Sequence, residues 1–387
     1  MTAIPEVQFT KEVLQQAAEQ QTGLSDWGER PFEPGLDVLL NAINQEAQLN
    51  PLGRFGTWNS MVRILSNWLK LQADDYRSLP TDDRKMIFIL GPARSGTTLL
   101  QRLFCRDPQA GFLRYTDVQF PAPATALGTS ADEEKLQQCR ALTATMYQYL
   151  PAMRWMHESQ PEMPDEEVFL FEHQFICVLF ALRMYVPSYK AWYLTTDLHA
   201  ESYRELQRLI TYIGQHRQFS HWVFKAPQHL FTLDTLLATF PNAKLIWLHR
   251  DPVKTMPSLS SLGWNISKLN SDAITPVQIS QAIIDFMQVG IERAMAVREQ
   301  IGDDQFRDVY YRDLMADPVA EVRRIYDELD LPFSEQMAVA MQEWLMANPQ
   351  HKHGRHAYSL EEFGLTEAGL LERFSGYSNH FQIPREG

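Results

Sequence analysis

Residues 91–98 read Gly-Pro-Ala-Arg-Ser-Gly-Thr-Thr and form the strongest local signal in the chain. They follow a short apolar run and precede a helical segment, and at such a junction backbone N–H groups can curve around an anion. The two glycines permit close backbone approach and unusual dihedral angles. An arginine there can grip phosphate or sulfate with two hydrogen bonds, and the hydroxyl groups add donors. The sequence therefore predicts an anion-binding loop formed by Arg94, Ser95, Gly96, Thr97 and Thr98.

The loop lacks a lysine that ATP-binding loops carry, and this absence limits which nucleotides it is predicted to bind. It resembles the GxxxxGK[ST] loop of ATP-binding proteins, but Thr97 stands where the lysine belongs. That lysine normally reaches the β and γ phosphates of ATP, so its absence argues against an ATPase or a kinase. Arg94 supplies the cation instead. The alternative is a capped strand-to-helix turn that carries a surface arginine.

A second candidate anion site lies at residues 244–258, which read KLIWLHRDPVKTMPS. A strand ends near His249, and Asp251-Pro252 is a good helix start. The helix would bring Ser258 back toward Arg250, where the two side chains can hold a second phosphate. The alternative for Arg250 is an ordinary pairing with a surface carboxylate. The string His-Arg-Asp also occurs in protein kinases, but the other kinase motifs are missing.

Apolar runs at 86–90, 222–224, 245–248 and 309–311 predict the strands that position these residues. Runs without alternation indicate strands buried on both faces, as in a parallel sheet covered by helices. Helical spacing dominates residues 1–80 and 130–215, including a predicted helix with Val168, Phe171, Phe175, Leu179 and Leu182. We expect an α/β fold: a P-loop-type parallel sheet flanked by helices, with a helical N-terminal extension (1–80) on a catalytic domain (81–387) that carries a helical insertion (about 130–215).

Composition excludes several classes of protein. The formal net charge of −13 makes non-specific nucleic-acid binding a poor prediction. No apolar stretch approaches the roughly 20 residues that span a bilayer, and no secretory signal is apparent, so we expect a cytoplasmic protein. The cysteines Cys105, Cys139 and Cys177 are far apart, which argues against a zinc site or a disulfide framework.

Taken together, the two anion motifs resemble those of the sulfotransferase family. Arg94-Ser-Gly-Thr-Thr98 looks like its 5′-phosphosulfate loop, and Arg250 with Ser258 looks like its 3′-phosphate pair, spacing included. The segments TGLSDWG, NQEAQLNPLGR, VFKAPQHL and HGRHAYSLEEFGLT resemble a bacterial-type branch, so the likeness runs through most of the chain. Phenol-type members carry a lysine where Arg94 stands, and this chain is similar to the arginine-bearing members.

The resemblance implies a donor, 3′-phosphoadenosine-5′-phosphosulfate (PAPS), and no metal. A transferring sulfuryl group bears less negative charge than a phosphoryl group, so side-chain cations and backbone donors can replace Mg²⁺. It also implies that a basic patch, Lys352, His353, Gly354 and Arg355, closes over the 3′-phosphate, with an exposed charged loop as the alternative. The acceptor would be a small molecule, a lipid or a glycan.

Lys225 ends the predicted strand 222–224 and should lie at the carboxyl edge of the sheet, where ligands bind. We expect Arg94 and Lys225 to stabilise charge in the transition state, although Lys225 could instead be a solvent-exposed strand end.

Two residues compete for the role of general base. His229 resembles the region of the histidine base in phenol-type members, with a spacing that differs by two residues. Asp117 falls where arginine-loop members carry a carboxylate, and it would need a pKa raised by burial. We favour Asp117 slightly on resemblance. A helix cap (Asp117) and a packed histidine (His229) are the structural alternatives.

Two further hypotheses concern the acceptor pocket and the whole activity. His157 and the acidic run 165–167 are candidates for the pocket wall, with a solvated helix start as the alternative. A nucleotide kinase or NTPase with a degenerate loop would depend on magnesium. A non-catalytic nucleotide-binding protein would bind the bisphosphate product without turnover.

Overall fold

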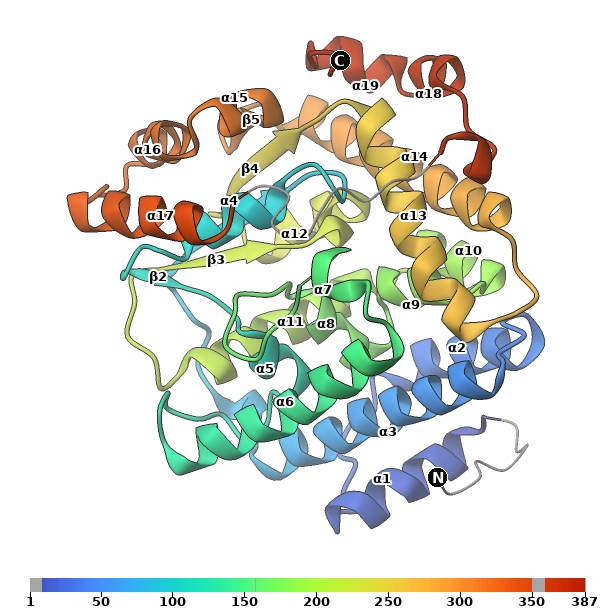
Figure 1. The fold of residues 1–387 in the computed structure, drawn as a ribbon. Helices are drawn as coiled ribbons and strands as arrows, with labels where there is room; N and C mark the ends of the chain where they lie inside the picture. The colour runs from blue at the N-terminus through green and yellow to red at the C-terminus, as the bar shows by residue number, and fades with distance from the viewer. Residues whose placement is uncertain (1–8, 157, 350–358, 387) are drawn as a thin grey trace.

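The computed structural model describes residues 9–156, 158–349 and 359–386. Within these residues, five strands form one parallel sheet in the order β2-β3-β1-β4-β5 (Figure 1). The strands are β1 (Lys85–Leu90), β2 (Ala110–Gly111), β3 (His221–Lys225), β4 (Lys244–His249) and β5 (Phe306–Tyr310). The predicted fold class, an α/β fold with a parallel sheet flanked by helices, is confirmed.

The strands carry no polar alternation because both faces of the sheet are covered. Phe88, Trp222 and Trp247 belong to one buried cluster, which continues into α11 (His199–Gly214), α12 (Leu233–Thr239) and α14 (Pro276–Ile301). The alternate residues, such as Ile87 and Ile246, belong to a second cluster with α4 (Thr97–Phe104), α16 (Pro318–Glu328) and α17 (Glu335–Ala347). The sheet is thus the middle layer of three.

Helix starts follow the sequence signals closely. α13 (Pro252–Asn270) is capped by Asp251, whose Oδ1 accepts a hydrogen bond from the Val253 N–H at 2.9 Å. α16 has the same arrangement, with Asp317 as the cap and Pro318 at the first position. Each pairing of a capping carboxylate with a proline fixes where the helix begins: α13 follows the end of β4, and α16 follows α15 (Tyr311–Ala316).

The insertion is helical in its described part: α6 (Ser130–Tyr149), α7 (Met153–Met156), α8 (Val168–Phe171), α9 (Val178–Arg183), α10 (Pro187–Thr195) and α11. The single helix predicted through Phe175 is wrong, because the chain turns at Phe175 with φ 53°. The Tyr189 hydroxyl donates to the Phe175 carbonyl, and the Gln228 side chain accepts from the Val178 N–H. These side chains replace the backbone partners that a continuous helix would have supplied.

The N-terminal helices α1 (Lys11–Thr22), α2 (Glu33–Gln45) and α3 (Pro51–Ala73) share the first buried cluster with the sheet. Trp27 and Phe32 lie between α1 and α2 and join Trp68 of α3 in this cluster, and the Phe32 and Trp68 rings meet edge to face at 4.8 Å between centroids. The boundary at residue 80 stays a prediction. The remaining helices are α5 (Tyr115–Gln119), α15 (Tyr311–Ala316), α18 (Glu367–Arg373) and α19 (Ser375–His380), with short 3-10 turns that include η3 (Pro227–Phe231).

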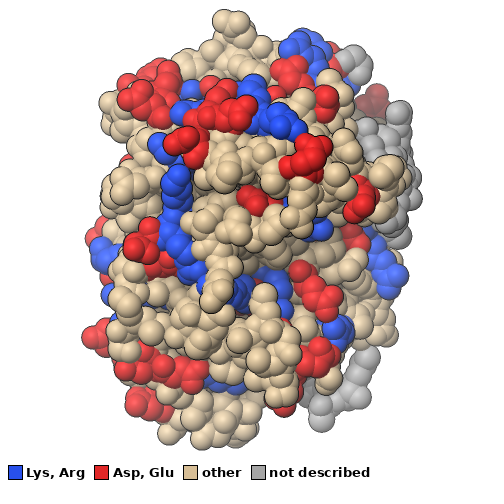
Figure 2. All heavy atoms as spheres, turned by 90° about the vertical axis from the view of Figure 1, so that its left-hand side faces the viewer, with Lys and Arg blue, Asp and Glu red and all other residues tan. Residues whose placement is uncertain are grey.

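The surface carries side chains of both charges, although the net charge is acidic. On the face at the left of Figure 1, Lys and Arg side chains form an interrupted column with Asp and Glu on both sides (Figure 2). In the described part of the chain, no helix has the length and apolar character needed to cross a membrane.

Candidate active site

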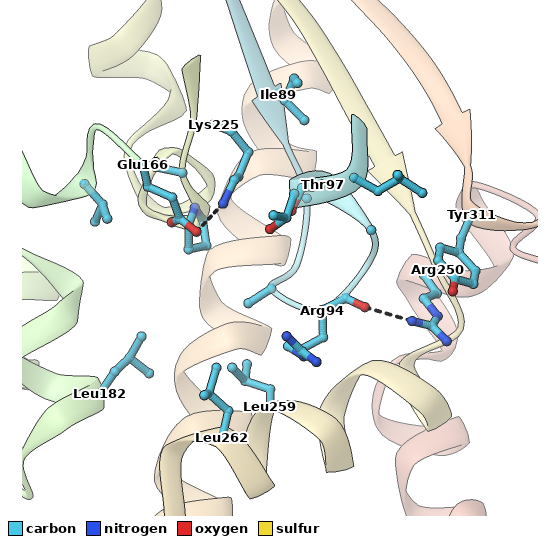
Figure 3. A pocket seen from close by; sticks show the side chains of 18 of the residues that line it. Ile89, Arg94, Thr97, Glu166, Leu182, Lys225, Arg250, Leu259, Leu262 and Tyr311 are labelled. Atoms are coloured by element: carbon cyan, nitrogen blue, oxygen red, sulfur yellow. Dashed lines mark hydrogen bonds and ion pairs between the residues drawn. The ribbon is translucent and has the colours of Figure 1, made fainter. Parts of the chain in front are cut away.

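A cavity of about 440 Å³ lies at the carboxyl ends of the central strands (Figure 3). Ile89 of β1, Lys225 at the end of β3 and Arg250 just after β4 contribute to its wall, together with the loop that follows β1. β1 lies between β3 and β4, so the chain crosses from one side of β1 to the other between these strands. Ligands of open α/β sheets bind at such a switch point.

The loop 91–96 has the backbone of an anion cradle. Gly91 has φ 145° and Gly96 has φ 104°, which other residues rarely adopt. A Cβ atom on Gly91 would lie 2.6 Å from the Leu248 carbonyl oxygen, and one on Gly96 would lie 2.8 Å from the Tyr311 ring. Ser95 is fully buried, and its Oγ has no hydrogen-bond partner among the described residues. A buried hydroxyl in this state fits a ligand that brings an acceptor.

Arg94 adopts φ 73°, an uncommon conformation for a residue with a side chain. Its Nε donates to Ser258 Oγ at 3.1 Å, and its Nη1 donates to the Met156 carbonyl at 2.6 Å. The guanidinium group therefore lies between α13 and α7 and lines the cavity. Backbone strain kept at such a position is typical of sites in which side-chain placement matters.

Arg250 lies beside the same loop. Its Nη1 donates to the Arg94 carbonyl at 3.0 Å, and its guanidinium carbon lies 3.7 Å from the centre of the Tyr311 ring (Figure 3). Arg94 contacts both Arg250 and Ser258, so the structure brings the three predicted anion-binding residues together. Thr97 and Thr98 also line the cavity.

The C-terminal segment adds a residue that the sequence did not reveal. The Glu386 carboxylate accepts hydrogen bonds from Arg250 Nε at 2.9 Å and Nη2 at 3.0 Å. The backbone N–H of Glu386 and the side chain of Arg385 both donate to Asp251 Oδ2. This part of the chain is therefore tied to the start of α13, and nothing in its local sequence signals that contact.

Lys225 and Glu166 form an ion pair at the cavity wall (Figure 3). Lys225 is buried, and the Glu166 side chain is 13% exposed. Among the described residues that line the cavity, Glu166 is the only carboxylate. The solvated helix start considered for residues 165–167 is therefore the wrong description, because Asp165 and Glu167 are buried as well.

Much of the cavity wall is apolar. Figure 3 shows Leu182 of α9 across from Leu259 and Leu262 of α13, with the Arg94 guanidinium group beside the two α13 leucines. Val168, Phe169, Leu179, Ile266 and Met153 also line the cavity, and so does Arg183 of α9, which pairs with Glu172. Gly263 lets α13 pack closely on α14, since a Cβ there would lie 2.2 Å from an Ile283 methyl group. The cavity thus combines cationic side chains with a largely aliphatic wall.

Asp117 is not among the described residues that line the cavity. It is fully buried in α5 and accepts hydrogen bonds from Arg114 Nη2 at 2.9 Å and Arg217 Nη2 at 2.7 Å. Burial alone would raise the pKa of Asp117, but the two guanidinium groups outweigh it and hold the pKa well below its ordinary value. The raised pKa that a base at this position would need is absent, and the contacts fit a structural carboxylate.

His229 also lies behind the cavity wall and not in it. It is fully buried on η3, with Nε2 2.6 Å from Glu167 Oε1 and Nδ1 2.7 Å from the Tyr203 hydroxyl. Both ring nitrogens are therefore engaged by protein groups. Asp117 and His229 thus lie outside the cavity lining and apart from the other predicted site residues. Local spacing does not reveal this, because the partners of both side chains come from distant elements.

The basic patch Lys352, His353, Gly354 and Arg355 and the candidate His157 lie outside the described residues. Cys105, Cys139 and Cys177 are buried and free. Within the described residues, no group of three or more His, Cys, Asp or Glu side chains is placed to hold a metal ion.

Comparisons with known proteins agree with this geometry. Residues 86–335 match the family described as "Sulfotransferase family". The crystal structure of the sulfotransferase STF1 from Mycobacterium tuberculosis is 30% identical, with a TM-score of 0.84 over 95% of this chain and 99% of that chain. The sulfotransferase STF9 from Mycobacterium avium is 26% identical, with a TM-score of 0.87 over 99% of each chain. A relative from Mycobacterium bovis, named omega-hydroxy-beta-dihydromenaquinone-9 sulfotransferase Stf3, is 24% identical over 324 residues, or 77% of this chain and 76% of the relative.

Proposed function

This chain belongs to the sulfotransferase family, and we propose that it transfers the sulfuryl group of PAPS to the hydroxyl group of an apolar alcohol. The observation that carries the proposal is a single cavity whose described lining combines Arg94, Lys225 and Glu166 with many aliphatic side chains. Family membership leaves no support for the competing hypotheses of a nucleotide kinase and of a non-catalytic binding protein.

PAPS carries anionic groups at its 5′ and 3′ ends, and the two basic clusters suit both. The loop N–H groups would hold the 5′-phosphosulfate, together with Arg94 and the Ser95 hydroxyl, which has no partner in the part of the chain that the structure describes. Arg250 and Ser258 would hold the 3′-phosphate, and we retain the basic patch 352–355 as a predicted cover. A planar guanidinium group suits the bidentate geometry that a phosphate offers.

In the proposed reaction, the acceptor oxygen bonds to sulfur while the bond from sulfur to the bridging oxygen of the 5′-phosphate breaks. The electron pair of that bond stays on the bisphosphate product, and the hydroxyl proton passes to a base. Arg94 and Lys225 would stabilise the charge that develops on the bridging and sulfuryl oxygens. Two fixed cations at a buried site are worth more than the same charges in water, because the local dielectric constant is lower.

We assign the base to Glu166 in place of Asp117 and His229. It is the carboxylate among the described residues at the cavity wall, and it forms an ion pair with Lys225. The same lysine would then contact both the base and the sulfuryl group, which places the acceptor hydroxyl between them. A base positioned in this way typically contributes ~10²–10⁴-fold to the rate.

The aliphatic part of the wall supports an apolar acceptor over a glycan. Sugar hydroxyls require several hydrogen-bonding side chains, whereas the lining at α9 and α13 is mainly leucine and isoleucine, and the one arginine there, Arg183, pairs with Glu172. The name of the relative from Mycobacterium bovis refers to a hydroxylated menaquinone, which is consistent with an alcohol on an apolar body. Each methylene group buried there would add about 0.8 kcal/mol of binding free energy.

The test is turnover of PAPS with primary alcohols of increasing chain length, with glucose and a simple phenol as comparisons. We expect kcat/KM to rise about threefold to fourfold per added methylene group until the aliphatic part of the wall is covered. The rate should be unchanged by a metal chelator. A preference for glucose over every alcohol, or no release of the bisphosphate with any acceptor, would overturn the proposal.

A further inference from the structure

We propose that His229, Tyr203 and Glu167 form a buried hydrogen-bond chain that positions the Lys225–Glu166 pair for sulfuryl transfer. This inference rests on the proposed function, because it assumes that Lys225 and Glu166 contact the reacting groups. It gives His229 a role that acts through Glu167. It also assigns a role to Tyr203, which lies on α11 behind the sheet.

The consecutive residues Glu166 and Glu167 hold Lys225 at two points. The Glu166 carboxylate pairs with Lys225 Nζ in the cavity, and Glu167 Oε2 accepts a hydrogen bond from the Lys225 backbone N–H at 2.8 Å. β2 ends at Gly111, opposite Trp222, so no strand lies beside Lys225 on that side of β3. Glu167 therefore supplies the acceptor that a longer β2 would have supplied.

Glu167 is itself held from behind. Its Oε1 lies 2.6 Å from His229 Nε2, His229 Nδ1 lies 2.7 Å from the Tyr203 hydroxyl, and that hydroxyl lies 2.9 Å from Thr232 Oγ1. Glu167, His229 and Tyr203 have no exposed surface. A buried carboxylate without partners is costly, so this chain is what allows Glu167 to remain at the end of β3.

One arrangement of donors and acceptors satisfies the whole chain. With the proton of a neutral imidazole on Nε2, Glu167 accepts from the Lys225 N–H and from His229, and Nδ1 accepts from the Tyr203 hydroxyl. Burial raises the pKa of Tyr203 far above its ordinary value, so its hydroxyl keeps the proton that it donates. Thr232 can then donate to the Tyr203 oxygen.

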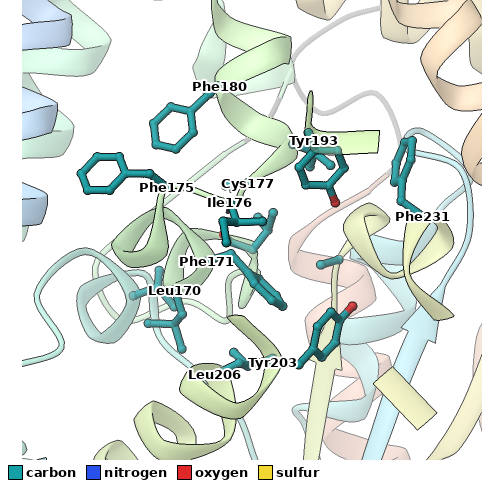
Figure 4. Close-up of a cluster of buried hydrophobic side chains, with 14 of the residues drawn as sticks. Leu170, Phe171, Phe175, Ile176, Cys177, Phe180, Tyr193, Tyr203, Leu206 and Phe231 are labelled. Carbon is teal, nitrogen blue, oxygen red and sulfur yellow. Dashed lines mark hydrogen bonds between the residues drawn. The ribbon is translucent and has the colours of Figure 1, made fainter. Parts of the chain in front are cut away.

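Aromatic packing fixes this chain in place. The His229 ring meets Phe88 edge to face at 5.1 Å between centroids, and Phe171 meets Tyr203 at 4.9 Å. Figure 4 shows Phe171 and Tyr203 side by side in the buried cluster, with Tyr193 farther along the same core. A rigid support of this kind holds a catalytic pair to the small tolerance that transfer requires.

The first experiment compares Tyr203→Phe with Tyr193→Phe. Tyr193 is an equally buried tyrosine whose hydroxyl has no hydrogen-bond partner among the described residues, so it is a matched control. We expect Tyr203→Phe to lower kcat about threefold to tenfold with both KM values unchanged, and Tyr193→Phe to leave kcat within about twofold. Equal kcat values for the two variants, or a loss in Tyr203→Phe that only follows a lower melting temperature, would refute the positioning role.

The second experiment uses rescue at His229. The amide of His229→Gln can still donate to Glu167, whereas His229→Leu leaves Glu167 Oε1 without its donor while Oε2 keeps the Lys225 N–H. We expect the glutamine variant to keep at least about a tenth of the wild-type kcat and the leucine variant to lose about 100-fold or more. If the two variants are equally inactive while Glu166→Gln stays active, His229 is the base and both this inference and the assignment of Glu166 fail. If Glu166→Gln is inactive and Tyr203→Phe is unaffected, only the positioning chain fails.

Discussion

Replacing Glu386 by glutamine should tighten the binding of 3′,5′-bisphosphoadenosine. In the structure, the Glu386 carboxylate accepts two hydrogen bonds from Arg250, at 2.9 Å from Nε and 3.0 Å from Nη2. These are donors that the 3′-phosphate would use in the proposed complex. The nucleotide must therefore break this pair, and a neutral glutamine would oppose it less.

The expected size follows from the exposure of the pair. The Arg250 and Glu386 side chains are 22% and 26% exposed, so the pair lies between a surface and a buried ion pair. Because the two hydrogen bonds are bidentate, the stabilising free energy of the pair should lie at the upper end of the range for exposed ion pairs, about 1 kcal/mol. That free energy corresponds to a dissociation constant about fivefold lower in Glu386→Gln.

Isothermal titration calorimetry at low and at moderate salt would measure the effect, which should shrink as salt rises. Adenosine 5′-phosphosulfate, which has no 3′-phosphate, should bind the variant and the wild type alike. Glu367→Gln is a matched control, because Glu367 pairs with Arg385 in the same C-terminal region and does not contact Arg250. Weaker bisphosphate binding in Glu386→Gln would refute the reasoning and show that the carboxylate holds Arg250 in place for the phosphate.

Four further predictions can be tested with the same protein. Arg94→Ala should lower kcat by about 100-fold or more, because a preorganised cation at the transferring group is lost; a rate near wild type in a coupled bisphosphate-release assay would contradict its place in the site. Glu166→Gln should lower kcat about 10²–10⁴-fold and leave bisphosphate affinity unchanged, as calorimetry can check. Leu182→Ser should lower kcat/KM for a twelve-carbon alcohol about tenfold with little effect on a four-carbon one, and equal losses would argue against an apolar acceptor. Burial, with a smaller effect of the Arg63 charge, lowers the pKa of His173 from 6.5 to about 3. Between these pH values the unfolded chain binds one more proton than the folded chain, so the free energy of unfolding falls as pH falls. His173→Gln should therefore remove about 2 kcal/mol of the fall in unfolding free energy between pH 7 and pH 5, as measured by urea unfolding.

The sheet and the phosphate loop could be predicted because their signals are local. A buried parallel strand needs an uninterrupted apolar run, and the loop needs glycines at positions where a Cβ would meet Leu248 or Tyr311. The helix caps at Asp251 and Asp317 are local as well. Each of these signals is a pattern of a few consecutive residues, although the Leu248 and Tyr311 contacts that require the glycines come from distant parts of the chain.

The base and the C-terminal contact could not be predicted, because their partners come from distant segments. Asp117 is held in its ionised form by Arg217, one hundred residues away, and His229 is occupied by Glu167 and Tyr203. The turn at Phe175 likewise depends on Tyr189 and on Gln228, which take over its backbone hydrogen bonds and those nearby. No local pattern distinguishes these side chains from catalytic ones, because both kinds combine a charge with burial.

The contact between α3 and α13 limits how far the chain can be shortened from its amino-terminal side. Gly53 lies so close to the backbone of Asn270 that a Cβ would be 2.2 Å from its carbonyl oxygen, and the Asn50 N–H donates to the same oxygen at 2.8 Å. α13 also carries Leu259 and Leu262, which line the cavity, and Ser258, which accepts a hydrogen bond from Arg94, so the same helix connects the cavity to the first eighty residues. An expression clone trimmed to the family match at residue 86 would leave that helix unsupported, and mutant libraries for new acceptors should keep the amino-terminal helices intact.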